Sequence, residues 1–149
     1  MLTPQDLQPE QATKRYADLT LGDAIGLSTR EMTALRQAAD ALRRDGKLEE
    51  ALALWGAILT CDPYEARPWK EIAQLQQRLG QHTQAITAYE MLARVADREA
   101  EPSYREALSC VAMGDKKTAR NLLEHAVMLC STTAQPWVVH AQRTLEKVR

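Results

Sequence analysis

Phenylalanine is absent from this 149-residue chain, and aromatic residues of all kinds make up only 5% of it. A β-sandwich or β-barrel usually needs more aromatic and β-branched side chains than this to cover its sheets. Apolar residues nevertheless make up 45% of the chain, so it can bury a core. The composition therefore favours a globular, all-α protein.

An excess of positive charge is also missing. The chain has 19 Lys and Arg residues against 20 Asp and Glu residues, which gives a net charge of −1. A general surface for nucleic acid or for an anionic membrane needs a basic excess. We therefore expect neither nucleic acid nor a membrane among the partners.

Cysteine is scarce and is not spaced for a site. Cys61, Cys110 and Cys130 are odd in number and form no C-x-x-C motif, which argues against a disulfide framework and against a zinc site. The first ten residues show no basic stretch followed by an apolar one, and no apolar run approaches the roughly 18 residues that span a bilayer. The sequence predicts a soluble cytosolic protein whose reduced cysteines pack as small apolar side chains.

Catalytic and cofactor-binding motifs are missing as well. Among the three histidines only His125 lies near a cysteine, and a His–Cys pair five residues apart on one helix does not face correctly as base and nucleophile. The glycines form neither GxGxxG nor GxxxxGK[ST], so no phosphate-binding loop is indicated. We expect no enzymatic activity, no cofactor and no metal, which leaves a binding surface as the basis of function.

What the chain does contain is an internal repeat of 34 residues. Gly46, Gly80 and Gly114 recur at this period, and each is followed five residues later by an alanine and nine residues later by a large apolar residue. The period and the order of these residues resemble the tetratricopeptide repeat, a helix–turn–helix unit. Glycine suits the turns because it adopts a positive φ without steric cost.

The repeat predicts an all-α fold in which three tetratricopeptide-like helix–turn–helix repeats form a curved superhelical array. An N-terminal leader, flexible at first and then helical from Tyr16 to Leu27, is expected before the array, and a C-terminal closing helix after it. The expected boundaries are 1–31 for the leader, 32–133 for the array (repeats 32–65, 66–99 and 100–133) and 134–149 for the closing helix. The expected helices lie near 29–44, 48–60, 64–78, 82–95, 102–113, 116–130 and 134–147.

Local signals support these helices. Ser28 with Glu31 is typical of a capping box, and Asp62 followed by Pro63 and Glu65 is typical of an N-cap, a first-turn proline and a first-turn acid. Small residues recur where paired helices must approach closely, and these are Ala39, Ala51, Ala73, Ala85, Ala107 and Ala119.

A curved array of helix pairs presents the first helix of each pair on its concave face. The 34-residue period assigns a protein-binding groove to matching positions of the three first helices. These positions are Arg36, Asp40, Arg43, Arg67, Lys70, Gln74, Gln77, Tyr104, Leu108 and Val111. The groove is expected to be polar and basic at one end and apolar at the other, which suits an extended peptide with an acidic or polar half and an apolar half.

Three further stretches carry a narrower resemblance. They are GLS-x2-E-x2-A-L-x3-A from Gly26 to Ala39, D-x-Y-x-x-R from Asp62 to Arg67, and Gly80-Gln81 followed by Ala85-Ile86-x2-Tyr89. Over roughly residues 20–130 the chain resembles the class II chaperones of bacterial type III secretion, the SycD/LcrH family. That resemblance implies a chaperone of the bacterial cytoplasm that binds two pore-forming translocators and keeps them soluble, apart and secretion-competent.

The resemblance also implies that a short extended translocator segment lies in the groove. Members of the family usually offer tyrosines and other apolar side chains in the first repeat, where this chain has Arg36 and Arg43. A transcriptional regulator and a second copy of the chain, bound through the leader, are further partners that we consider. Two other functions stay open at this point, a chaperone of the type III needle subunit and a generic tetratricopeptide scaffold or co-regulator.

Overall fold

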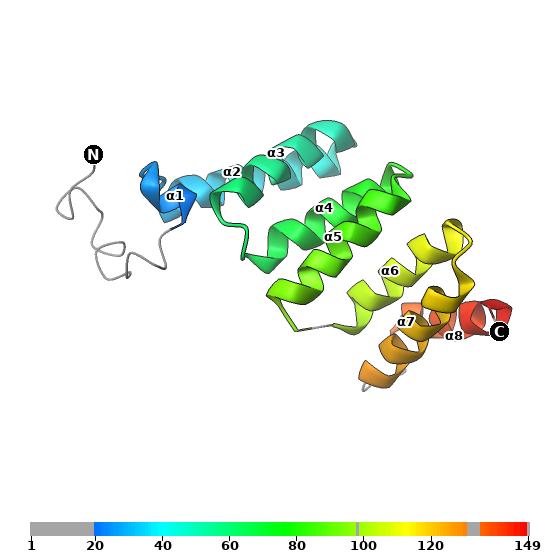
Figure 1. Ribbon diagram of the computed structural model, residues 1–149. Coiled ribbons are helices and arrows are strands. Elements are labelled where there is room, and N and C mark those ends of the chain that lie inside the picture. Colours follow the sequence, from blue (N-terminus) through cyan, green and yellow to red (C-terminus); the bar gives the residue numbers. More distant parts are fainter. Residues whose placement is uncertain (1–19, 98, 131–134, 149) are drawn as a thin grey trace. The chain divides into compact units, whose positions relative to one another are not determined.

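The computed structural model describes residues 20–97, 99–130 and 135–148, and the regular elements within these ranges are all helices (Figure 1). In chain order they are α1 (Leu21–Ala24), α2 (Thr29–Arg44), α3 (Leu48–Cys61), α4 (Ala66–Arg78), α5 (His82–Val95), α6 (Ala100–Ala112), α7 (Lys116–Leu129) and α8 (Pro136–Val148). The predicted all-α fold is confirmed. Helices α2 and α5 have the expected bounds, and the others from α3 to α8 differ from them by one or two residues at an end.

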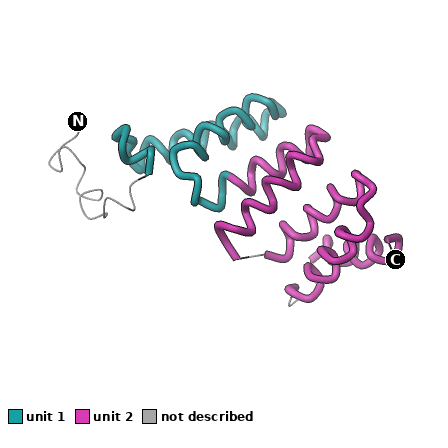
Figure 2. The backbone as a smooth tube through the Cα atoms, viewed as in Figure 1, with its two compact units in different colours: residues 1–68 teal, residues 69–149 magenta. Residues whose placement is uncertain are grey.

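The chain forms two compact units, one ending at Pro68 and the other beginning at Trp69 (Figure 2). In unit 1, α3 packs against both α1 and α2. In unit 2, α6 packs against α5, α7 and α8, and α7 also packs against α8. The division falls inside α4, so the boundaries of the three repeats stay a prediction.

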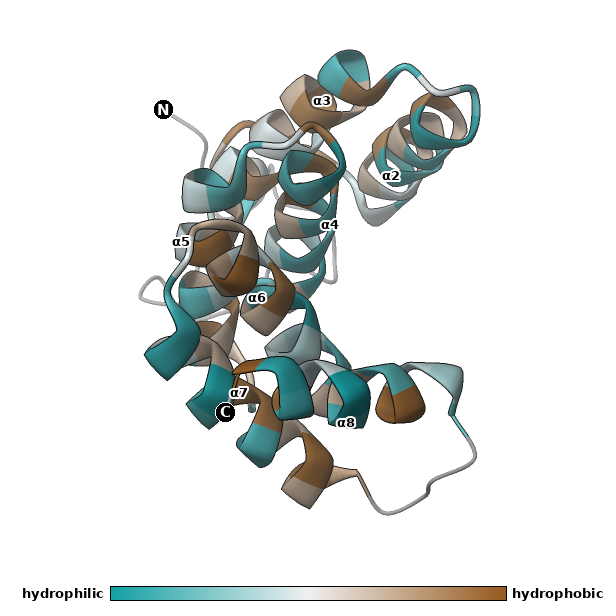
Figure 3. Ribbon diagram, turned by 90° about the vertical axis from the view of Figure 1, so that its right-hand side faces the viewer, coloured by the Kyte–Doolittle hydropathy of each residue, from teal (hydrophilic) through white to brown (hydrophobic). Residues whose placement is uncertain are grey.

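The small residues of the repeat lie in the helix contacts, as the sequence predicts. All six alanines at the recurring positions are 0% exposed, and they are Ala39, Ala51, Ala73, Ala85, Ala107 and Ala119. A methyl side chain at these points lets neighbouring helices approach closely, and larger side chains such as Trp55 and Leu123 fill the space around them. Hydrophilic and hydrophobic residues alternate along α7 and α8, as expected for helices with one buried face (Figure 3).

The turns between paired helices depend on the three repeat glycines. Gly46, Gly80 and Gly114 have φ values of 78°, 74° and 81°, which confirms the positive φ expected of them. At the start of α2 the capping box is also confirmed. The Ser28 hydroxyl accepts from the Glu31 N–H at 3.2 Å, and the Glu31 carboxylate accepts from the Ser28 N–H at 2.8 Å and so holds the pKa of Glu31 below its usual value.

The second expected helix start is wrong. Helix α4 begins at Ala66, and Asp62 instead follows the last residue of α3. The Asp62 carboxylate accepts from the Tyr64 N–H at 3.0 Å, so this side chain closes a local turn and does not cap the helix that follows.

The leader is less helical than expected. Residues 16–19 lie outside the described part of the chain, and in the described part α1 ends at Ala24, three residues before Leu27. Gly22 is the buried residue that faces Cys61 of α3, whereas Leu21 and Ile25 are 49% and 60% exposed. The backbone of α1, rather than an apolar stripe, therefore makes the contact with α3. No helix among the residues that the structure describes is long and apolar enough to cross a membrane.

Candidate functional site

In unit 1 the structure brings together all four of its expected groove residues. Helical spacing places Arg36, Asp40 and Arg43 on one face of α2, because residues three and four apart are neighbours. Arg67 reaches Asp40 from the first turn of α4, with 2.7 Å between Nη2 and Oδ2. The Arg43 Nη2 atom lies 3.7 Å from the other oxygen of the same carboxylate.

Two further side chains complete this group, and sequence reasoning did not assign them to the groove. The Glu65 carboxylate accepts from Arg36 Nη2 at 2.6 Å. The Arg67 guanidinium lies 5.3 Å above the centre of the Trp55 ring, which is itself 0% exposed. Glu65 falls two residues before Arg67, an expected groove residue, and this proximity in the sequence was the signal that could have assigned Glu65 to the site.

The face of α2 that carries Asp40 and Arg43 also has a shallow hollow. Its volume is about 310 Å³, and it is lined by Gln37, Asp40, Arg43 and Arg44. Because Arg43 and Asp40 belong to both the hollow and the ion pairs, the basic end of the expected groove is a charged surface with fixed side chains.

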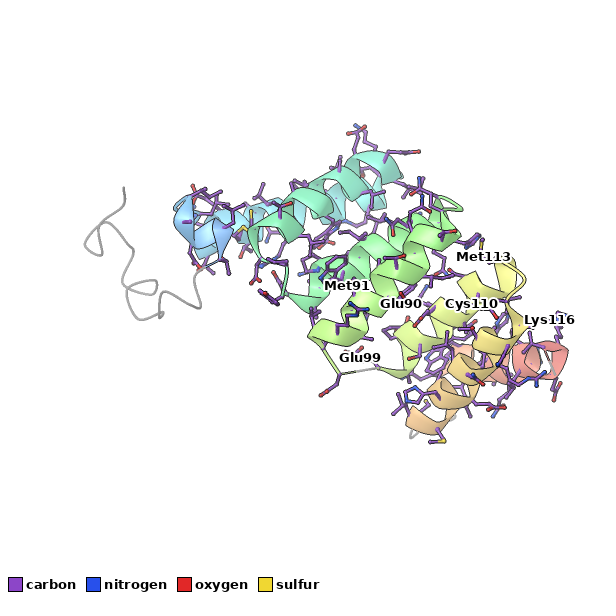
Figure 4. All side chains as sticks on the ribbon, viewed as in Figure 1. Glu90, Met91, Glu99, Cys110, Met113 and Lys116 are labelled. Atoms are coloured by element: carbon purple, nitrogen blue, oxygen red, sulfur yellow. The ribbon has the colours of Figure 1, made fainter. Side chains whose placement is uncertain are left out.

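In unit 2 the three polar groove residues of α4 are all half-buried, and Lys70 and Gln77 are engaged with residues outside α4. The Lys70 ammonium pairs with Glu99 at 3.6 Å. Glu99 lies just before α6 (Figure 4). Gln74 is half-buried. The Gln77 amide nitrogen donates to the Arg105 carbonyl at 2.7 Å and to Ser109 Oγ at 2.8 Å, both on α6. Gln77 therefore ties α4 to α6 and does not offer its amide nitrogen to a ligand.

The network around Gln77 is buried. Tyr89 is 2% exposed and donates its hydroxyl to Gln77 Oε1 at 3.3 Å, and burial raises the pKa of Tyr89 above its usual value. Ser109 is 0% exposed and also lies 3.4 Å from Nδ1 of His82. A buried polar group without a partner costs free energy, so each member depends on the others.

We expect Gln77→Ala to lower the free energy of unfolding by about 2 kcal/mol, because it leaves a buried hydroxyl and a buried carbonyl without their donor. Gln74→Ala on the same helix serves as the matched control and is expected to change stability by less than about 0.5 kcal/mol. Urea unfolding followed by circular dichroism measures both. Equal effects of the two substitutions would contradict the structural role of Gln77.

The apolar groove residues of α6 are covered more than the sequence predicts. Tyr104 is 8% exposed, its ring stacks on Trp137 of α8 with 5.3 Å between ring centres, and its hydroxyl shares a 2.7 Å hydrogen bond with His140 Nδ1. Burial raises the pKa of Tyr104. Leu108 and Val111 are half-buried and pack against the same core. The expectation that Tyr104 points into an open groove is therefore wrong in this respect, since the closing helix α8 covers it.

The expected groove residues thus form one group in unit 1 and a second set in unit 2. A single groove that runs through all of them stays a prediction. Cys110 packs as an apolar side chain, as expected, because it is 2% exposed and burial raises its pKa to about 11. Within the described ranges no three His, Cys, Asp or Glu side chains gather as they would around a metal ion.

Comparison with known protein families identifies the chain. The family model described as "BTAD: Bacterial transcriptional activator domain" matches residues 10–108. The chain belongs to this family. A search of curated protein sequences found no match.

Solved structures resemble this member of the bacterial transcriptional activator domain family over most of its length. A chain in a T3SS complex from Aeromonas hydrophila is 26% identical, with a TM-score of 0.78 over 87% of each chain. PcrH, known from Pseudomonas aeruginosa, in complex with the chaperone binding region of PopD is 26% identical, with a TM-score of 0.73 over 83% of this chain and 94% of that one.

A third similar structure is the type III secretion chaperone SycD of Yersinia enterocolitica, in complex with a peptide of the translocator YopD. It is 22% identical and has a TM-score of 0.77 over 82% of this chain and 95% of that one, which shows a shared fold. SycD is a translocator chaperone, and PcrH is bound to a chaperone binding region, so the resemblance to the SycD/LcrH family is confirmed.

Proposed function

We propose that this protein is a chaperone that binds an extended segment of a type III secretion translocator on the inner helices α2, α4 and α6. The observation that carries the proposal is its similarity, at 26% identity and a TM-score of 0.73, to PcrH in complex with the chaperone binding region of PopD. A second complex of PcrH, with the corresponding region of PopB, is 23% identical to this chain and supports the same client class. The protein is expected to keep its clients soluble and secretion-competent without enzymatic turnover.

The side chains on the inner helices are suited to such a client. Lys70 of unit 2 is partly exposed near the start of α4, and Arg36 and Arg43 of unit 1 lie on one face of α2. Leu108 and Val111 of α6 supply half-buried apolar surface. An extended segment with polar and apolar parts can therefore find hydrogen-bond partners and apolar contacts on these helices.

A homodimer through the leader is part of the same proposal. Leu21 and Ile25 of unit 1 are large apolar residues exposed to solvent, and such residues are suited to an interface. One structure of SycD, 22% identical to this chain, is an alternative dimer.

Synthetic peptides with the sequences of the chaperone binding regions of PopD and PopB test the client class. We expect both to bind the full chain with micromolar dissociation constants in fluorescence polarisation, and scrambled peptides of the same composition not to bind.

Lys70→Glu is expected to weaken binding about tenfold, because it replaces a cationic donor on an inner helix with an anion.

The control for Lys70 is the pair Lys116→Glu and Lys117→Glu, at the start of α7, where both side chains are exposed (Figure 4). This pair is expected to leave binding unchanged. Equal loss in both variants, or no binding of either peptide, would contradict the proposal.

A transcriptional role is the second candidate, and the match of residues 10–108 to the transcriptional activator domain family favours it. In that case the inner helices would bind a transcriptional regulator. Affinity capture from a secreting bacterium, with mass spectrometry, separates the two. Recovery of translocators supports the chaperone, whereas recovery of a regulator without translocators supports the second candidate.

A further inference from the structure

The strongest charged feature of unit 1 is the group formed by Arg36, Asp40, Arg43, Arg44, Glu65 and Arg67, here named the arginine cluster. We propose that the arginine cluster is a subsite for the carboxylate of an acidic residue, Asp or Glu, in the extended client segment. This inference rests on the proposed function and adds the chemistry that selects the client.

The charges of the cluster do not balance. Two carboxylates face Arg36, Arg43 and Arg67, and the exposed Arg44 adds a further positive charge beside them. The four arginines therefore leave an excess of two positive charges on a chain whose net charge is −1. A local excess of this kind on a nearly neutral chain favours an anionic ligand at this place.

The cluster also has more hydrogen-bond donors than acceptors. Three guanidinium groups carry roughly 15 N–H donors, whereas two carboxylates offer roughly 8 acceptor sites. Nε of Arg36 and Oδ1 of Asp40 are both buried without a hydrogen-bond partner among the described residues, so the ion pairs leave one donor and one acceptor of the cluster unsatisfied. A client carboxylate would supply two further acceptor oxygens that match the fork of an arginine.

The cluster is held in place before any ligand arrives. Asp40 fixes Arg67 from one side through the 2.7 Å ion pair, and the buried ring of Trp55 supports its flat face. The Arg67 side chain nevertheless remains 50% exposed, so some of its donors face solvent. Arginines fixed in this way lose little conformational entropy on binding, which strengthens the attraction for a ligand.

A hollow on α2 beside the ion pairs gives room for a client side chain. The hollow of about 310 Å³ on α2 is lined by Arg43 and Arg44 together with Gln37 and Asp40. This volume admits the short side chain of an Asp or Glu residue from a peptide that lies along the helix. A peptide acid is therefore the occupant that both charge and size support.

The test uses the full chain and a peptide set built on the chaperone binding region of PopD. Each position of the peptide is replaced in turn by Glu and, separately, by its neutral isostere Gln. We expect at least one position at which the Glu peptide binds about tenfold tighter than the Gln peptide in fluorescence polarisation, because a charge-assisted hydrogen bond replaces a neutral one.

In the double variant Arg43→Gln with Arg67→Gln, we expect the Glu peptide and the Gln peptide to bind with about equal affinity. Arg30→Gln is the matched control, since Arg30 is an exposed arginine of the same helix outside the cluster. It is expected to keep the preference. If the glutamine variant does not fold, Arg43→Lys with Arg67→Lys keeps the charge but removes the guanidinium fork, and a reduced Glu-to-Gln ratio then supports the subsite.

The outcomes separate this inference from the proposed function. Equal binding of Glu and Gln peptides at every position, with the parent peptide bound, overturns the subsite and leaves the chaperone proposal standing. If the double glutamine variant or the double lysine variant keeps the full preference for the Glu peptide over the Gln peptide, the assignment to the arginine cluster is overturned. Failure of every peptide to bind overturns both proposals, whereas binding by Glu peptides alone supports the subsite and contradicts the likeness to PopD recognition.

Discussion

Replacing Ala85 with glutamate is expected to abolish the cooperative unfolding transition of unit 2. Ala85 lies on α5 and is 0% exposed, so the new carboxylate has no route to solvent. Burial of an unpaired charge costs several kcal/mol, and a domain of this size is typically stable by only about 5–15 kcal/mol. Because α5 packs against α6, and α6 in turn against α7 and α8, the loss is expected to spread through the unit.

Circular dichroism with thermal unfolding measures this effect. The control is Gln84→Glu, which introduces the same charge at the neighbouring exposed position of the same helix. The control is expected to unfold within a few degrees of the parent protein. A cooperative transition in the Ala85 variant near the parent temperature would show that this helix contact is open to water.

The second large effect is expected at Tyr104. Tyr104→Ala removes the ring that stacks on Trp137, and we expect it to lower the free energy of unfolding by about 3–5 kcal/mol. Tyr104→Phe keeps the ring and loses only the hydrogen bond to His140, so about 1 kcal/mol is expected. Urea unfolding of both variants measures the difference.

The same pair of variants separates stability from binding. If Tyr104 affects client binding only by supporting the core, the Phe variant is expected to bind the PopD peptide as the parent protein does. The Ala variant would then lose binding in proportion to its unfolding. An Ala variant as stable as the Phe variant would contradict the packing of α8 on Tyr104.

The sequence could predict the helices because their signals are local. The glycines with positive φ and the Ser28–Glu31 capping box depend on residues within a few turns of one another, and the 34-residue period repeats such local signals along the chain. The same period located the alanines at the helix contacts, and all six are buried. Local signals were misread at Asp62, whose carboxylate binds the Tyr64 N–H and does not cap α4, and in the leader, where α1 ends at Ala24 and not at Leu27.

The sequence predicted which residues share a helix face in the candidate site, but not which of them are paired or accessible. The period placed Arg36, Asp40 and Arg43 on one helix face, and spacing alone is enough for that. It could not reveal that Glu65 pairs with Arg36, because that contact joins residues 29 positions apart. Contacts of this kind depend on how the start of α4 approaches α2.

By itself, therefore, the sequence determined the all-α class, the approximate bounds of α2 to α8 and which residues share a helix face, since each follows from periodicity along one helix. Only the tertiary structure decided which of those residues remain accessible. It placed Gln77 in a buried network with α6, covered Tyr104 with α8 and fixed Arg67 between Asp40 and Trp55. The physical reason is that the neighbouring helix sets the accessibility and the hydrogen-bond partners of a side chain. The periodicity along one helix carries no information about the side chains of the helix that packs against it.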